Sequence, residues 1–123
     1  MKKQSLPQSF RSALEGIANV FRDERNFKIH ALFACGACAA AILLKIESRD
    51  FLIIGLAITL VIAAELVNTA VEKVVDIKTT ARDPLAKAAK DAAAGAVLAA
   101  AVFSVVAGCA IFIPKIVSAI RKL

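Results

Sequence analysis

Residues 92–113 read AAAGAVLAAAVFSVVAGCAIFI, an apolar run without a single charged side chain. A helix needs roughly 20 mostly apolar residues to cross the hydrocarbon core of a bilayer. The run meets that length without interruption. It therefore predicts a membrane-spanning helix near the C-terminus.

Two more apolar blocks precede this run. Residues 29–46 are interrupted only by His30 and Lys45, and the block at residues 51–66 continues less purely to residue 75. At 59% hydrophobic residues and a mean hydropathy of +0.73, the 123-residue chain has too little polar sequence to cover three such helices in water. We predict an all-α membrane protein that forms one domain over residues 1–123, with spans at about 28–46, 51–75 and 90–113.

The first apolar block is not expected to be a cleaved signal peptide. A long charged segment precedes it, and no small-residue cleavage site leads into a polar domain.

Basic residues are divided unequally between the two sides of these spans. The N-terminal segment 1–28 and the connector 73–91 carry eleven Lys and Arg residues, whereas the first loop and the C-terminal tail carry five. Because short cytoplasmic loops are enriched in Lys and Arg, the N-terminus and the connector are predicted to be cytoplasmic. The formal charge of +6 suits anionic lipid headgroups and does not require a nucleic-acid partner.

The N-terminal segment is predicted to be an amphipathic surface helix at about residues 8–26. Its apolar residues recur at helical spacing: Phe10, Leu14, Ile17, Ala18 and Phe21. Charged residues occupy positions between them, which is typical of a helix lying in the membrane interface. Ser9 is the predicted N-cap. Further along, Asp83 and Pro84 are predicted to begin the last helix, and Pro114 to end or kink it.

Polar side chains interrupt one face of the second span. At 100° per residue, four of them fall within about an 80° stripe: Glu65, Asn68, Glu72 and Asp76. The stripe rises roughly 16 Å along the helix axis. Ionisable residues within a membrane are costly and usually face a bundle interior or a wet cavity, so they indicate a functional site. Interfacial pairing with Lys73 or Lys78 is the structural alternative for the last two, but no basic residue in the same stretch neutralises Glu65.

Two more polar clusters are predicted at the lower end of this stripe. One comprises Lys87, Lys90 and Asp91, and the other lies at residues 22–26. Acidic residues there can hold Mg²⁺, which takes one or two carboxylates plus substrate phosphates, and Lys90 can neutralise phosphate charge. With the deeper Glu65 as a base, the set has the parts that phosphoryl transfer needs. The spacing leaves one alternative open, a small ion-coupled transporter subunit in which Glu65 relays a proton or cation.

The residues ELVNTAVE at 65–72, followed by Asp76, Ala89-Lys90-Asp91 and the residues GAVL at 95–98, resemble the signature of the bacterial integral-membrane diacylglycerol kinase family. The residues ERNFKIH at 24–30 resemble its undecaprenol kinase branch. The resemblance covers nearly the whole chain. It implies an ATP- and Mg²⁺-dependent kinase acting on a membrane lipid alcohol, with undecaprenol preferred and diacylglycerol the alternative.

The resemblance also implies an assembly, a location and a role for each site residue. It implies a homotrimer with sites shared between subunits, in the bacterial inner membrane, with the active site facing the cytoplasm. The implied roles are a general base at Glu65, magnesium ligands at Glu24 and Glu72, nucleotide contacts at Lys90 and Asp91 together with Glu24 and Glu72, and site-lining positions at Asn68 and Asp76. Ser12 stands where other members have a tyrosine beside the nucleotide, and Asp83 where they have a histidine. Ser12 is kept as a candidate nucleotide contact.

Two other kinds of residue are not predicted to be functional. Cys35 and Cys38 form a C-x-x-C pattern, but they lie within an apolar span with no further ligands nearby, so packing is expected there. His30 begins the first span and is predicted to be an interfacial hydrogen-bonding residue and not a catalyst.

Overall fold

The structure is a computed structural model that describes residues 5–123. These residues form four helices and no strand: α1 (Leu6–Asp23), α2 (Arg25–Leu43), α3 (Ser48–Lys78) and α4 (Pro84–Ile120). The prediction of an all-α protein with a short N-terminal helix and three long ones is confirmed. Lys2 and Lys3, which contribute to the predicted basic N-terminus, lie outside the described residues.

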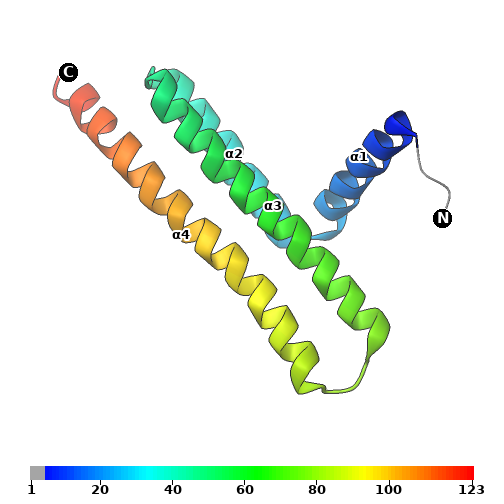
Figure 1. Cartoon of the computed structure of the whole chain (residues 1–123). Helices are drawn as coiled ribbons and strands as arrows, with labels where there is room; N and C mark the ends of the chain where they lie inside the picture. The colour runs from blue at the N-terminus through cyan, green and yellow to red at the C-terminus, as the bar shows by residue number, and fades with distance from the viewer. Residues whose placement is uncertain (1–4) are drawn as a thin grey trace.

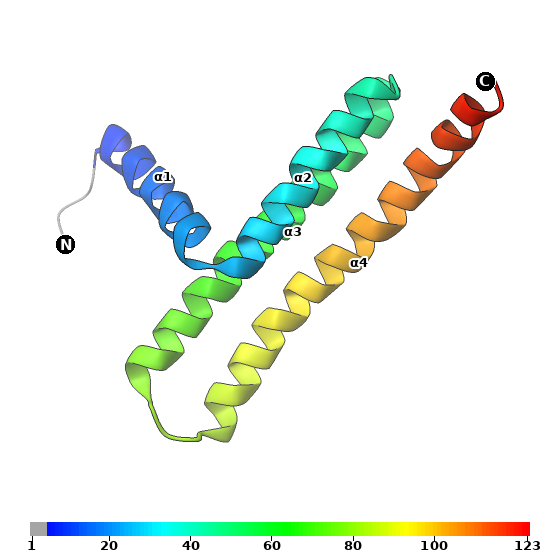
Figure 2. The same cartoon turned by 180° about the vertical axis from the view of Figure 1, so that it is seen from behind.

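The long helix α3 is the centre of the bundle. It contacts all three other helices, with α4 running antiparallel along its length (Figure 1). α2 lies along the first half of α3, and α1 leaves the bundle at an angle from the start of α2 (Figure 2). The end of α3 and the beginning of α4 extend past the start of α2 and are joined there by a short connector. We call this the connector end of the bundle.

Helices α2, α3 and α4 are each long and apolar enough to cross a membrane. α3 and α4 extend beyond the predicted spans at both ends, because the helical backbone continues past the apolar residues that hydropathy detects. α2 begins three residues before its predicted span and ends at Leu43, before the predicted limit at residue 46. Pro114 does not end α4, which continues to Ile120. Within a membrane span, neighbouring groups and small backbone adjustments can compensate for the hydrogen bond that a proline removes.

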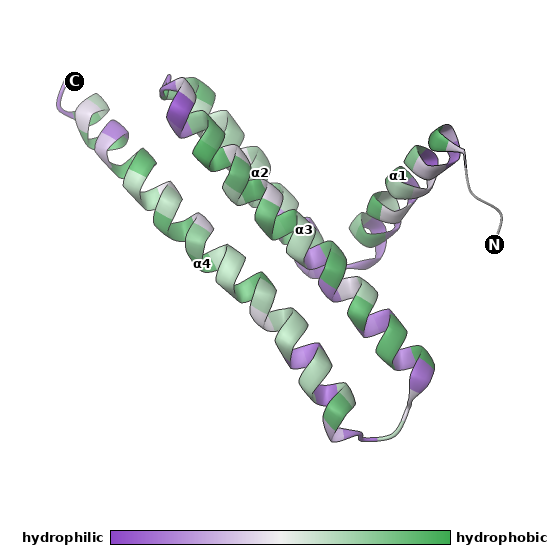
Figure 3. Cartoon of the chain, viewed as in Figure 1, coloured by the Kyte–Doolittle hydropathy of each residue, from purple (hydrophilic) through white to green (hydrophobic). Residues whose placement is uncertain are grey.

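Most large apolar side chains lie on the surface of the single chain. The buried apolar residues are few: Val20, Phe27, Ala41, Ile54, Ala57, Val61 and Ala107. Apolar residues cover the middle of the three long helices, whereas hydrophilic residues gather towards the connector end (Figure 3). Such a surface would favour aggregation in water, but it suits helices that face lipid or other membrane helices.

The cap of the surface helix α1 lies four residues before the predicted cap at Ser9. Ser5 is the N-cap, and its backbone N–H donates to Gln8 Oε1 at 3.0 Å. The Ser9 N–H donates to the Ser5 carbonyl, so Ser9 is already inside the helix. The capping-box spacing of Ser5 and Gln8 explains this start. The helix displays its predicted apolar face, since Phe10 and Leu14 are both exposed.

Helix α1 ends at Asp23, before the predicted limit at residue 26. Glu24 has an extended backbone (φ −101°, ψ 118°) and joins α1 to α2. Across this joint, the rings of Phe21 and Phe27 meet edge to face with centroids 6.2 Å apart. Phe27 is also buried, so aromatic packing sets the angle at which α1 leaves the bundle.

Local capping explains the two remaining connections. At the α2–α3 turn, Lys45 has a φ of 49°, and the Ile46 N–H donates to the Ala41 carbonyl at 3.2 Å. This is the hydrogen bond of a Schellman motif, which ends a helix with a left-handed residue. At the other connection, Asp83 caps α4 by accepting from the backbone N–H groups of Leu85 at 2.7 Å and Ala86 at 3.2 Å. The predicted start of the last helix is confirmed, and the Asp83 carboxylate serves as its cap.

Candidate active site

Glu65 extends a buried apolar stripe on α3. The buried residues of this helix follow one another at spacings of three or four: Ile54, Ala57, Val61, Glu65 and Thr69. Glu65 is only 4% exposed. A carboxylate in such surroundings requires a hydrogen-bonding or charged partner, because burial without one is strongly unfavourable.

That partner comes from a neighbouring helix. His30 Nε2 on α2 lies 3.1 Å from Glu65 Oε1, and the imidazole is about a quarter exposed. His30 is therefore the polar partner of the Glu65 carboxylate, a contact that the sequence did not indicate. The polar partner of the Glu65 carboxylate is thus supplied by α2 and not by another residue of α3.

One and two helical turns further along α3 lie Asn68 and Glu72. Asn68 Nδ2 donates to Glu72 Oε1 at 3.2 Å, and both side chains are half-buried. Asn68 Oδ1 is buried and meets no hydrogen-bond donor within the described part of the chain. A carboxylate beside an unpartnered amide oxygen is a set of oxygen donors, the kind of ligand that Mg²⁺ takes. The donor chemistry therefore fits a magnesium ion.

The connector end contains two ion pairs made by charged residues of α3 and α4. Lys90 on α4 forms an ion pair with Asp76 on α3, and Lys87 pairs with Asp91 within α4. These four side chains line a cavity of about 890 Å³, together with Arg82 and other connector residues. Its volume lies within the range of small-ligand sites. The structure thus places Asp76, Lys90 and Asp91 in one cavity.

The joint between α1 and α2 lies beside this part of α3. A hydrogen bond from Arg22 holds the pKa of the exposed Asp23 carboxyl below its usual value. Desolvation opposes this shift, and the charges of Arg22, Lys73 and Lys28 add to it. Since Lys73 belongs to α3, the neighbouring Glu24 lies near the region that carries Glu72. Glu24 itself is half-buried.

The predicted metal ligands do not form a complete cluster within one chain. Among residues 5–123, no three His, Cys, Asp or Glu side chains come together in a way that could hold a metal ion. Mg²⁺ in nucleotide sites commonly uses one or two carboxylates and completes its coordination with phosphates and water.

Ser12, the remaining nucleotide candidate, is exposed on α1. It lines neither the cavity at the connector end nor the apolar groove described next.

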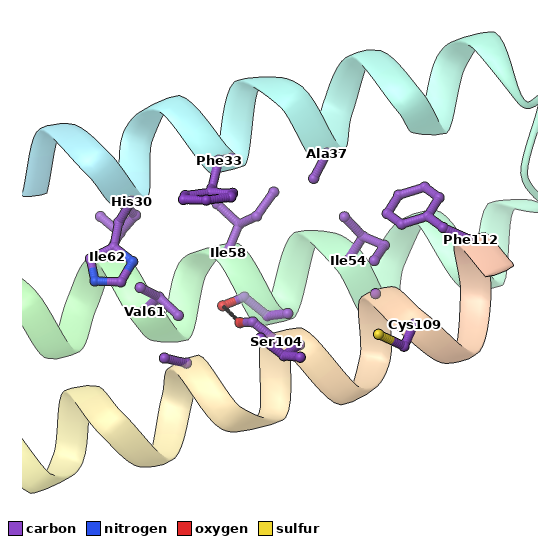
Figure 4. Close-up of a pocket in the computed structure, with 15 residues that line it drawn as sticks. His30, Phe33, Ala37, Ile54, Ile58, Val61, Ile62, Ser104, Cys109 and Phe112 are labelled. Atoms are coloured by element: carbon purple, nitrogen blue, oxygen red, sulfur yellow. Dashed lines mark hydrogen bonds between the residues drawn. The ribbon is translucent and has the colours of Figure 1, made fainter.

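An apolar groove of about 420 Å³ lies between α2, α3 and α4. His30 lies towards one end of it beside Val61 and Ile62, and Phe112 lies towards the other (Figure 4). The groove therefore runs from the partner of Glu65 into the apolar part of the bundle. Pockets of this kind, mostly apolar with a few polar groups at one end, are typical of ligand sites.

Residues 11–112 match the family model described as prokaryotic diacylglycerol kinase. The chain belongs to this family. An undecaprenol kinase of Bacillus subtilis (strain 168) is 46% identical over 109 residues, which cover 89% of each chain. A diacylglycerol kinase of Synechocystis sp. is 41% identical over 111 residues, covering 89% of this chain and 63% of the relative. A diacylglycerol kinase of Haemophilus influenzae is 32% identical over 95 residues, covering 77% and 80%.

The protein is thus a lipid kinase of the membrane, and its resemblance to the undecaprenol kinase branch is supported. Family membership decides against the transporter alternative. The hydrogen bonds on the other side of Glu65 agree with this decision, because Thr59 Oγ1 donates to the Gly55 carbonyl at 2.8 Å and Ser104 Oγ to the Ala57 carbonyl at 3.3 Å. Both hydroxyls donate to backbone carbonyl groups, so neither extends the polar stripe of α3.

Proposed function

We propose that this lipid kinase transfers the γ-phosphoryl group of ATP to the hydroxyl of undecaprenol, with Mg²⁺ as cofactor. The observation that carries the proposal is the position of Glu65. Its buried carboxylate lies between an apolar groove at His30 and the polar residues that follow on α3. A lipid chain and a nucleotide can therefore approach one carboxylate from opposite directions.

The lipid hydroxyl is deprotonated by Glu65. Its oxygen attacks the γ-phosphorus, its proton moves to the Glu65 carboxylate, and the bond from the γ-phosphorus to the leaving oxygen of ADP breaks. General-base catalysis of this kind contributes about 10²–10⁴-fold to a rate. Because Glu65 is shielded from solvent, the attacking oxygen is also kept away from water.

The nucleotide phosphates bind in the cavity at the connector end. Lys90 neutralises phosphate charge as a compact cation, and Asp76 holds its ammonium group by the ion pair between α3 and α4. Asp91 contributes to the same cavity and positions Lys87. Ser12 is a further candidate contact from α1. Positioning and charge stabilisation account for most of catalysis in phosphoryl transfer.

The magnesium site is assigned to Glu72, with Glu24 contributing from the joint between α1 and α2. The unpartnered Asn68 Oδ1 supports this assignment, because it is an oxygen donor held beside Glu72. When bound, Mg²⁺ neutralises charge on the phosphate oxygens and stabilises the transferring group. Glu24 and Glu72 are also assigned to the nucleotide site through this shared ion.

We prefer undecaprenol to diacylglycerol as the substrate. The 46% identical relative is an undecaprenol kinase that matches over 89% of both chains, and the groove at His30 is lined almost wholly by apolar side chains. A single polyprenyl chain suits it better than two acyl chains.

The purified kinase in mixed micelles with labelled ATP should show a kcat/KM for undecaprenol at least about tenfold above that for diacylglycerol, a difference of roughly 1.4 kcal/mol. Both lipids are presented at the same surface concentration, so the assay with one lipid is the control for the assay with the other. Equal or reversed values would assign the enzyme to diacylglycerol.

We further propose that one domain over residues 1–123 assembles as a homotrimer in the bacterial inner membrane, with its active sites shared between subunits and facing the cytoplasm. The excess of basic residues at the connector end supports this orientation. The exposed apolar side chains of α4, such as Leu98 and Val105, leave surface for neighbouring subunits.

Cysteine labelling tests the orientation. Ser48 and Lys78 are exposed at opposite ends of α3. In a background with the native cysteines replaced, an impermeant thiol reagent added to intact cells should label Ser48→Cys and spare Lys78→Cys. Opened membranes should label both and provide the control. Labelling of position 78 from outside would separate the polar residues from cellular ATP and contradict the proposal.

A further inference from the structure

The one histidine of the chain contacts the one carboxylate buried in its spans. His30 Nε2 lies 3.1 Å from Glu65 Oε1, while the Glu65 side chain is only 5% exposed. The two residues come from different helices, so the packing of α2 against α3 brings them together. Such a contact constrains the carboxylate more strongly than bulk water would.

A carboxylate that acts as a base needs a fixed orientation. The terminal torsion of a glutamate is broad, so the carboxyl group rotates easily when nothing holds it. A hydrogen bond from an imidazole N–H to one carboxylate oxygen removes this freedom, and a charged acceptor strengthens the bond. With Oε1 held by His30, Oε2 remains as the acceptor for a substrate proton.

His30 also borders the apolar groove. Its ring lies at the groove end that is shared with Val61 and Ile62 (Figure 4). A lipid chain in the groove would therefore bring its polar end to the imidazole and to the carboxylate behind it. The same side chain bounds the lipid path and contacts the base.

We propose that His30 is a positioning residue that orients Glu65 through the Nε2–H to Oε1 hydrogen bond and leaves Oε2 for the lipid hydroxyl. The inference rests on the proposed function of Glu65 as the base. In the transfer step, the hydroxyl proton moves to Oε2, the P–O bond to the lipid forms and the P–O bond to ADP breaks. The His30 Nε2 proton stays in place throughout.

Two variants separate positioning from packing. His30→Leu introduces an apolar side chain of similar length and removes the hydrogen-bond donor. Its kcat should fall about 10–100-fold, the scale of a misplaced catalytic group. KM for ATP should stay unchanged, because the nucleotide cavity lies further along α3. His30→Gln carries an amide N–H that can reach Oε1, so it should recover most of the loss. Thermal unfolding of both variants in detergent controls for folding.

A double-mutant cycle tests whether His30 acts through Glu65. In a Glu65→Gln background, adding His30→Leu should lower the residual rate no further, since residues that act as a unit are non-additive. A full additional loss in that background would overturn the proposal. So would equal activity of His30→Leu and His30→Gln, or a kcat for His30→Leu within twofold of the parent.

A spectroscopic measurement tests the contact independently of activity. Because the chain has a single histidine, ¹⁵N-histidine labelling gives one pair of ring nitrogen signals. These should report an Nε2–H imidazole, and they should shift in Glu65→Gln but not in the control Glu47→Gln. Unchanged signals in Glu65→Gln would overturn the contact. If the signals shifted but Glu65→Gln kept full activity, the contact would be confirmed and Glu65 would not be the base. His30 would then have no positioning function.

Discussion

Glu65→Gln is expected to slow phosphoryl transfer by about 10²–10⁴-fold, the usual contribution of a general base. Glutamine has nearly the same shape, and its amide oxygen can still accept a hydrogen bond from His30. The variant therefore removes the basic group while the buried stripe of α3 stays packed. The measurement is kcat with undecaprenol and ATP in mixed micelles. KM for ATP should change little.

Glu47→Gln provides a matched control for this prediction. It makes the same chemical change at the opposite end of α3, where Glu47 is exposed. Activity close to the parent is expected there, and both variants should unfold at similar temperatures. If Glu65→Gln retained activity within a few-fold of Glu47→Gln, the carboxylate would have a structural role and another group would have to accept the proton.

The polar stripe of α3 could be predicted because it depends on one helix alone. Periodicity places Glu65, Asn68 and Glu72 on a common face before any packing is known. The structure adds that Glu65 is buried, whereas Asp76 is mostly exposed and paired with Lys90. Burial decreases towards the connector end because α2 covers only the other part of α3 (Figure 1).

Contacts between helices could not be obtained in the same way. The pairing of His30 with Glu65 depends on the register of α2 against α3, which a single sequence does not specify. One signal was available, since His30 is a polar residue at the beginning of an apolar block and a buried carboxylate requires a partner. Combining the two observations would have indicated the pair.

Helix ends that a short local motif marks could also be predicted, whereas the others could not. Asp83 was recognised as the start of the last helix because Asp-Pro is a strong local motif, and its carboxylate caps α4. The earlier start of α1 was missed because the cap at Ser5 lies outside the apolar pattern that defined the surface helix. Pro114 does not end the last helix, because the cost of a proline in a span depends on neighbours that the sequence does not reveal.

The parts of the proposed site follow one another along α3. The groove ends at His30, the partner of Glu65. From Glu65, Glu72 lies two turns further on at about 10 Å, and Asp76 lies at roughly 16 Å. A lipid alcohol that gives its proton to Glu65 and a nucleotide that reaches into the connector cavity would therefore place the transferred phosphoryl group between Glu65 and Glu72. Glu72 would then lie on the nucleotide side of Glu65, where its carboxylate could hold a Mg²⁺ ion that would neutralise phosphate charge.

Glu72→Gln is accordingly expected to lower activity at low Mg²⁺ by about 10²–10³-fold, because metal stabilisation of the transferring phosphoryl group is worth several kcal/mol and each 1.4 kcal/mol is tenfold. The glutamine Oε1 can still accept from Asn68 Nδ2, so the hydrogen bond seen at 3.2 Å is kept and only the charge is lost. Raising the Mg²⁺ concentration should recover part of the rate, since a weakened site fills at higher concentration. Glu47→Gln should show the parent titration, which excludes a general effect of surface charge. A Mg²⁺ titration of Glu72→Gln that coincides with the parent would assign the ion to other ligands.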